Sequence, residues 1–183
     1  KGRYRYFHQW DIEIYGKPGL ESEAEIIELT SRLFDSLFLK DITIDINHRN
    51  LVESFINQTF DSKDPKLVGD MLRAIDKIQK KSKQEILNEF KDRYDINKLE
   101  KILEFSQIKG TIHEVESKFD TTKLQSWDEL KQLIDSLENR GVVNTRINFG
   151  IVRGLDYYSG TVFEVFDKNS TLGALAGGGR YDS

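Results

Sequence analysis

Residues 4–15 alternate in the manner of a half-buried strand, with mainly aromatic residues on one side and polar groups on the other. Successive side chains of a strand point to opposite faces, so the polar side could face a ligand. The first side comprises Tyr4, Tyr6, His8 and Trp10, and the second comprises Arg5, Phe7, Gln9, Asp11, Glu13 and Tyr15. The pattern predicts a strand over residues 4–15.

Helical spacing begins after a break rich in glycine and proline. Ser22 and Glu25 stand three residues apart, as in a capping box, ahead of apolar residues that recur with helical spacing as far as Phe38. This pattern predicts an amphipathic helix of about five turns. Isoleucines at alternate positions then predict a strand over residues 42–47 with one core face and one wet face, and helical spacing resumes over residues 51–56.

From about residue 67 to residue 140 the apolar positions keep helical spacing, interrupted by polar breaks. The predicted helices cover residues 67–81, 83–94, 96–108, 112–119 and 127–139. Gly141 suits the position after a helix, because glycine adopts a left-handed conformation without steric cost. These residues therefore predict a helical insertion.

Strand composition returns near the end of the chain. Residues 147–151 and 161–166 are rich in alternating apolar and β-branched side chains, and residues 156–160 between them have turn character. We expect two antiparallel strands joined by a hairpin. The order of the predicted strands and helices along the chain indicates an α+β fold, in which an antiparallel sheet is flanked by helices and interrupted by an all-helical insertion. The expected division is residues 1–60 and 141–183 for the two parts of the core, and 61–140 for the insertion.

Composition narrows the possible functions only slightly. The chain has 183 residues, 38% of them hydrophobic, and a net charge of −4, which does not indicate a general nucleic-acid surface. No apolar run approaches the roughly 18 residues that a membrane helix needs, so we expect a soluble protein with no membrane partner. The absence of cysteine and the scatter of three histidines predict neither disulfides nor a metal site.

Two motifs near the end of the chain are far more specific. Residues 153–164 read R-G-L-D-Y-Y-S-G-T-V-F-E, and residues 177–182 read G-G-G-R-Y-D. The first resembles the histidine-binding signature of the histidyl-tRNA synthetases, and the second resembles the glycine-rich motif that follows it in that family. The resemblance implies the catalytic core of a class II aminoacyl-tRNA synthetase, built around an antiparallel sheet.

The same resemblance extends to the beginning of the chain. Residues 2–13, G-R-Y-R-Y-F-H-Q-W-D-I-E, are similar to the later half of motif 2 in these enzymes. It implies that Gln9 lies near the amino and carboxylate groups of bound histidine and Glu13 near its imidazole. Residues four apart on a strand share a face, as such a site requires. Arg3 matches an arginine that contacts the phosphates of ATP.

The two late motifs supply the remaining expected site residues. Arg153 matches the catalytic arginine, and its guanidinium could bind phosphate and carboxylate oxygens together. Outside the motif, Arg153 would be interpreted as a surface arginine paired with Asp156. Tyr158 and Tyr181 match tyrosines of the histidine pocket, although a strand tyrosine more commonly packs in a core. The remaining candidates are Tyr157 for histidine and Gly178 and Gly179 for ATP.

The resemblance implies that histidine, ATP with Mg²⁺ and tRNA(His) are the substrates of a cytoplasmic homodimer without a tightly bound cofactor. The chain begins inside motif 2 and ends before motif 3, so we expect a catalytic-domain fragment that is inactive alone. The alternatives are a histidine-sensing regulatory subunit of ATP phosphoribosyltransferase and a tRNA-sensing synthetase-like domain. Lysines 77, 80, 81 and 83 could contact tRNA, but a solvated helix face is the simpler interpretation.

Replacing Arg153 by alanine in the full-length protein tests the central assignment. We expect histidine-dependent ATP–pyrophosphate exchange to fall by at least about 100-fold while histidine binding weakens less, because the arginine acts on charge that develops during the reaction. Exchange kinetics and direct histidine binding measure the two effects. An unchanged exchange rate would remove Arg153 from the mechanism.

Overall fold

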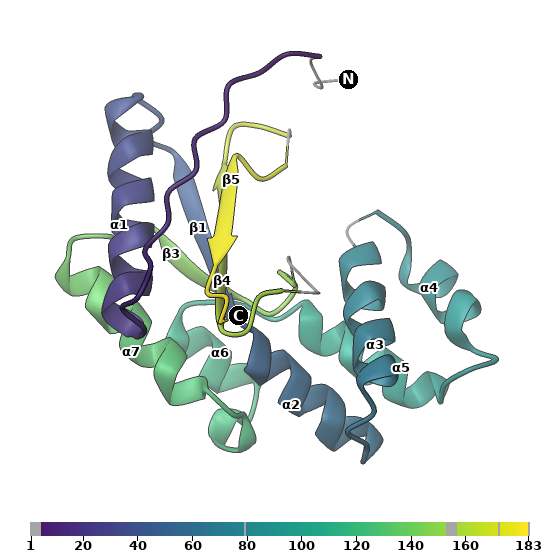
Figure 1. The fold of residues 1–183 in the computed structure, drawn as a ribbon. Helices are drawn as coiled ribbons and strands as arrows, with labels where there is room; N and C mark the ends of the chain where they lie inside the picture. The colour runs from purple at the N-terminus through teal and green to yellow at the C-terminus, as the bar shows by residue number, and fades with distance from the viewer. Residues whose placement is uncertain (1–4, 79, 153–156, 172, 183) are drawn as a thin grey trace.

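The computed structural model describes residues 5–78, 80–152, 157–171 and 173–182 (Figure 1). Its described strands form one mixed sheet in the order β2–β3–β1–β4–β5. Neighbouring strands are antiparallel except for β1 and β3, which are parallel. The strands are β1 (Ile42–His48), β2 (Lys109–Gly110), β3 (Thr145–Asn148), β4 (Thr161–Asp167) and β5 (Ala176–Gly179).

The prediction that a hairpin joins the strands now seen as β3 and β4 is wrong, because these two strands are not neighbours in the sheet. Strand β1 lies between β3 and β4, pairing with β3 from Ile44 to Ile46 and with β4 along its whole length from Ile42 to His48. The segment between β3 and β4 is long enough to cross over β1. Because β1 is buried along most of its length, it takes the central position, where neighbours satisfy both of its hydrogen-bonding edges.

The predicted helices are present, with somewhat different ends. Helices α1 and α7 pack against each other beside the sheet, and α2 leads from β1 toward a group formed by α3, α4 and α5, which stands apart from the sheet (Figure 1). The helices are α1 (Leu20–Ser36), α2 (Arg49–Phe60), α3 (Pro65–Lys77), α4 (Lys83–Phe90), α5 (Ile96–Ser106), α6 (Ile112–Lys118) and α7 (Trp127–Asn139), with a 3₁₀ turn at Thr121–Lys123.

Segment 61–140 also contributes to the sheet, because β2 within it pairs with β3. The division of the chain into two core parts and an insertion stays a prediction. Gly141 has φ +82° directly after the residue that caps α7, as the pattern predicted. In the part of the chain that the structure describes, no helix is both long and apolar enough to cross a membrane.

Two predictions at the start of the chain are wrong. Residues 5–19 form neither a strand nor a helix, and they run as an extended segment past α1 and β5 (Figure 1). Alternation alone does not make a strand, because a strand needs a hydrogen-bonded neighbour. The capping box is also absent: α1 starts at Leu20 after Gly19 at φ +126°, and the Ser22 hydroxyl donates to the Lys17 carbonyl at 2.8 Å.

The face of β1 predicted to be wet is buried. Asp45 and Asn47 are 1% and 0% exposed. Asp45 accepts two hydrogen bonds from the Arg146 guanidinium, at 2.8 and 2.9 Å, and a third from the amide of Asn148. Asn47 donates to the Ile151 carbonyl at 2.9 Å. Buried polar groups are normally hydrogen-bonded, as these two side chains are. The face of β1 that carries Asp45 and Asn47 is therefore both buried and polar.

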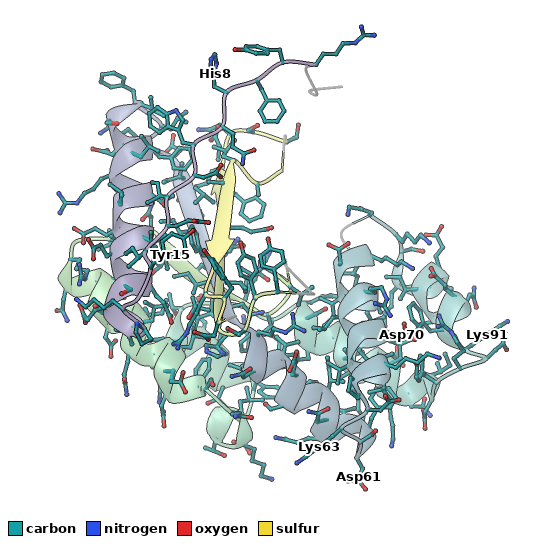
Figure 2. The ribbon with its side chains drawn as sticks, viewed as in Figure 1. His8, Tyr15, Asp61, Lys63, Asp70 and Lys91 are labelled. Carbon is teal, nitrogen blue, oxygen red and sulfur yellow. The ribbon has the colours of Figure 1, made fainter. Side chains whose placement is uncertain are left out.

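A second buried carboxylate joins the helices of the insertion. Asp70 on α3 is 5% exposed and accepts hydrogen bonds from Arg73 at 2.5 Å, Arg93 at 3.0 Å and Tyr94 at 2.5 Å. Figure 2 shows Asp70 within the helical group, away from the sheet. Burial opposes ionisation, but the hydrogen bonds from Tyr94 and Arg73 and the charge of Arg93 outweigh it and lower the pKa of Asp70.

Asp70→Asn is expected to lower the free energy of unfolding at pH 7 by about 1.5–3 kcal/mol, because it removes charge-assisted hydrogen bonds to a buried acceptor. A lowered pKa means that this stabilisation is present above the unfolded value of about 3.9 and is lost as pH falls through the folded value. Urea denaturation at pH 7 and at successively lower pH measures both effects. The exposed Asp92→Asn is the control, and equal losses in the two variants would contradict the prediction.

Candidate functional site

An open cleft of about 1010 Å³ lies between the N-terminal segment, α1 and β5. Residues 7–19 form one wall, α1 another, and residues 174–182 a third, with Tyr158, Thr161 and Phe163 also lining it. Figure 2 shows His8 toward the outer end of the N-terminal segment and Tyr15 beside α1. Gln9, Glu13, Tyr158, Gly178, Gly179 and Tyr181, all candidates from the sequence, line this cleft.

Glu13 and Tyr181 meet across the cleft, although they come from opposite ends of the chain. Burial and the nearby Glu13 carboxylate raise the pKa of the Tyr181 phenol. Tyr15 donates a hydrogen bond to the same carboxylate of Glu13. A carboxylate with phenols beside it is suited to a ligand that offers N–H donors.

Tyr15 was not among the candidates from the sequence. Its position two residues after Glu13, on the same side of an alternating segment, was the available signal. Gln9 lies earlier in this segment, and its amide nitrogen donates a hydrogen bond to the Asp11 carboxylate at 2.9 Å. The side chains of Gln9 and Glu13 are exposed, so both are accessible to a small molecule in the cleft.

The glycines of β5 allow the aromatic side chains of the site to approach its backbone. A Cβ on Gly179 would lie 2.6 Å from the Thr161 carbonyl oxygen and 3.0 Å from the Tyr158 ring. A Cβ on Gly178 would lie 2.9 Å from the Phe163 ring. All three distances are shorter than normal contacts, so the absence of side chains here shapes the wall of the cleft. A contact of these glycines with ATP stays a prediction.

The two adjacent tyrosines of the R-G-L-D-Y-Y motif differ in their surroundings. Tyr158 is partly buried and lies against β5, whereas Tyr157 is 60% exposed. Their ring centroids are 4.3 Å apart, with the ring planes tilted by 53°. Tyr158 is therefore the better placed of the two for a ligand in the cleft. Arg3 and Arg153 lie outside the described residues.

The lysine cluster of the insertion is extensively paired. Lys77 and Lys81 both contact Glu89, and Lys80 lies 3.4 Å from Asp76. Lys83 binds Glu100 at 2.6 Å and Glu104 at 3.0 Å, and these hydrogen bonds, with that of Glu100 the larger effect, raise its pKa. These ion pairs favour the interpretation as a solvated helix face.

Gly179→Ala tests whether the close packing of Tyr158 on β5 shapes the cleft. We expect the free energy of unfolding to fall by about 1–3 kcal/mol, because the added methyl group meets a backbone oxygen and an aromatic ring. Gly69→Ala, in the middle of α3, is the control and should be neutral or stabilising, since its Cβ would meet only Arg73 at ordinary contact distance. Thermal unfolding of the two variants compares them directly. A Gly179→Ala variant as stable as the wild type would contradict close packing of Tyr158 on β5.

Comparisons with known proteins place this chain in a family. The model of the histidyl-tRNA synthetase family matches residues 1–183. The histidine–tRNA ligase of Pyrococcus horikoshii is 37% identical over 190 residues, covering 100% of this chain and 43% of the relative. That of Clostridium tetani is 37% identical over 196 residues, covering 100% of this chain and 44% of the relative. The chain thus spans less than half the length of these curated relatives.

Solved structures agree with this comparison. A histidyl-tRNA synthetase from a Nostoc species matches with a TM-score of 0.79 at 26% identity, over 90% of this chain and 41% of that one. A Bacillus halodurans protein, described as an ATP phosphoribosyltransferase regulatory subunit/histidyl-tRNA synthetase, has a TM-score of 0.73 at 18% identity over 91% of this chain and 44% of that one, and shows the fold alone. With the whole chain matched by the family model, this chain belongs to the histidyl-tRNA synthetase family.

Proposed function

We propose that the protein carrying this chain is a histidine–tRNA ligase. It activates histidine with Mg²⁺-bound ATP to form histidyl-adenylate and pyrophosphate, and then transfers the histidyl group to tRNA(His). The observation that carries the proposal is the meeting of Glu13 and Tyr181 in one cleft. The family motifs imply both residues for the histidine pocket, and they come from motifs at opposite ends of the chain.

Recognition of the imidazole follows from the chemistry of these groups. A carboxylate accepts a hydrogen bond from a ring N–H, and a phenol donates one to the other ring nitrogen. A tyrosine phenol is protonated at neutral pH, so Tyr181 can donate this hydrogen bond. A site that pairs both ring nitrogens rejects amino acids that lack them by a factor on the order of 10⁴, because its polar groups would otherwise remain unpaired.

Activation requires the histidine carboxylate to attack the α-phosphate of ATP while pyrophosphate leaves. The two anions must be held together, and charge grows on the phosphate oxygens. Arg153 is proposed to neutralise that charge, with Arg3 on the ATP phosphates and Gln9 on the amino and carboxylate groups of histidine. Gly178 and Gly179 provide the bare backbone against which the nucleotide lies. Mg²⁺ enters with ATP as part of the substrate.

The alternative is a non-catalytic relative that binds histidine or tRNA without activating the amino acid. Structural likeness extends to an ATP phosphoribosyl transferase complex from Thermotoga maritima, at 22% identity and a TM-score of 0.61, which bears on the fold alone. The chain contains the complete R-G-L-D-Y-Y and G-R-Y-D sequences. Their retention favours the enzyme.

Histidine-dependent ATP–pyrophosphate exchange by the full-length protein tests this proposal. We expect exchange with histidine and at most about 10⁻⁴ of that rate with other amino acids. Glu13→Gln should raise the KM for histidine by about 10- to 100-fold, because it replaces a charge-assisted hydrogen bond to the imidazole by a neutral one.

The exposed Glu138→Gln is the matched control and should leave the KM for histidine unchanged. Binding of histidine without exchange would indicate the non-catalytic alternative. If the protein shows neither histidine binding nor exchange, both the ligase and a histidine-sensing relative are rejected.

A further inference from the structure

The Arg180 guanidinium lies between two carboxylates at the end of β5. Its Nη1 donates to Glu23 of α1 at 3.2 Å, and its Nε donates to Asp182 at 3.0 Å. Glu23 is mostly buried, with 15% of its side chain exposed, and its second oxygen accepts from the Thr161 hydroxyl at the start of β4. Glu23 therefore links α1 to both β4 and the end of β5.

Asp182 continues this network to the other late motif. Its Oδ2 accepts from the Ser159 hydroxyl at 2.7 Å, and its backbone N–H donates to the same hydroxyl at 3.0 Å. The hydrogen bond from Ser159 and the bond and charge of Arg180 lower the pKa of Asp182. Two backbone hydrogen bonds run alongside, from Ser159 to the Arg180 carbonyl and from Arg180 to the Thr161 carbonyl.

Close packing between Gly160 and Arg180 also fixes the positions of these two segments. A Cβ on Gly160 would lie 2.9 Å from Cδ of Arg180, so the stem of the arginine packs directly on the backbone of Gly160. The hydrogen-bonded residues 159–161 and 180–182 are thus held both by polar contacts and by close packing. Tyr158 immediately precedes the first of these segments, and Tyr181 lies within the second.

We propose that Glu23 is a positioning residue for the histidine pocket. Through Arg180 and Asp182 it holds the segments that carry Tyr158 and Tyr181, and so sets the affinity for histidine without touching it. This inference rests on the proposed function. It concerns Glu23, Ser159, Thr161, Arg180 and Asp182, none of which was a candidate from the sequence.

Loss of the Glu23 charge should act on substrate binding more than on the chemical step. A binding group is effective only when it is held within about 0.5 Å of its productive position. Misplaced phenols weaken the ground state and the transition state alike, which raises KM while leaving kcat nearly unchanged. These phenols are assigned to histidine and not to ATP, so the KM for ATP should change less than the KM for histidine.

The experiment compares Glu23→Gln and Ser159→Ala with Glu25→Gln in the full-length protein. Glu25 lies on the same helix and is exposed, which makes it a matched control. Steady-state pyrophosphate exchange gives kcat and the KM values for histidine and ATP, and thermal unfolding reports stability. We expect the KM for histidine to rise about 10-fold in the first two variants, with kcat within about threefold of the wild type.

An unchanged KM for histidine in both Glu23→Gln and Ser159→Ala overturns the inference, as does a loss of thermal stability without a change in this KM. If Glu23→Gln does not fold, Ser159→Ala decides alone, because it breaks the network at its other end. Measurements on the wild type distinguish failure of the proposed function from failure of the role of Glu23. Absence of histidine-dependent exchange in the wild type rejects the proposed function, whereas normal exchange with unaffected variants rejects only the role of Glu23.

Discussion

The antiparallel ladder between β1 and β4 is the contact on which the site depends. It joins segments that the whole helical insertion separates in sequence, from Ile42 opposite Asp167 to His48 opposite Thr161. Closing so long a loop costs conformational entropy, which the burial of both strands offsets. The ladder ends at Thr161, beside Ser159 and within reach of α1. Formation of the core therefore also assembles one wall of the cleft.

Polar groups in the interior make this arrangement specific. Asp45 is held by Arg146 and Asn148, and Asp70 by an arginine pair and a tyrosine. Each carboxylate is costly to bury without all of its partners, so alternative registers or helix placements would leave a charge unpaired. Arg180 between Glu23 and Asp182 applies the same principle at the rim of the cleft. There the polar contacts order one wall of the cleft.

Local patterns predicted the helices well and the sheet less well. The spacing of apolar residues predicted α3, α5 and α7 because a helix satisfies its hydrogen bonds within itself. A strand depends on its neighbours, so alternation over residues 4–15 predicted a strand that the structure does not form. The supposed hairpin failed for the same reason: turn-like residues before Thr161 did not reveal that β1 would lie between β3 and β4.

The amino-acid sequence alone identified the family and predicted Glu13, Tyr158 and Tyr181 for the candidate pocket, because each of these residues lies in a short contiguous motif. Tertiary structure decided which of these residues meet. The placement of Glu13 and Tyr181 in one cleft, and the position of Arg180 between two carboxylates, bring together segments from opposite parts of the chain. Such contacts depend on the course of the backbone between them, which neither motif spacing nor hydrophobic periodicity encodes.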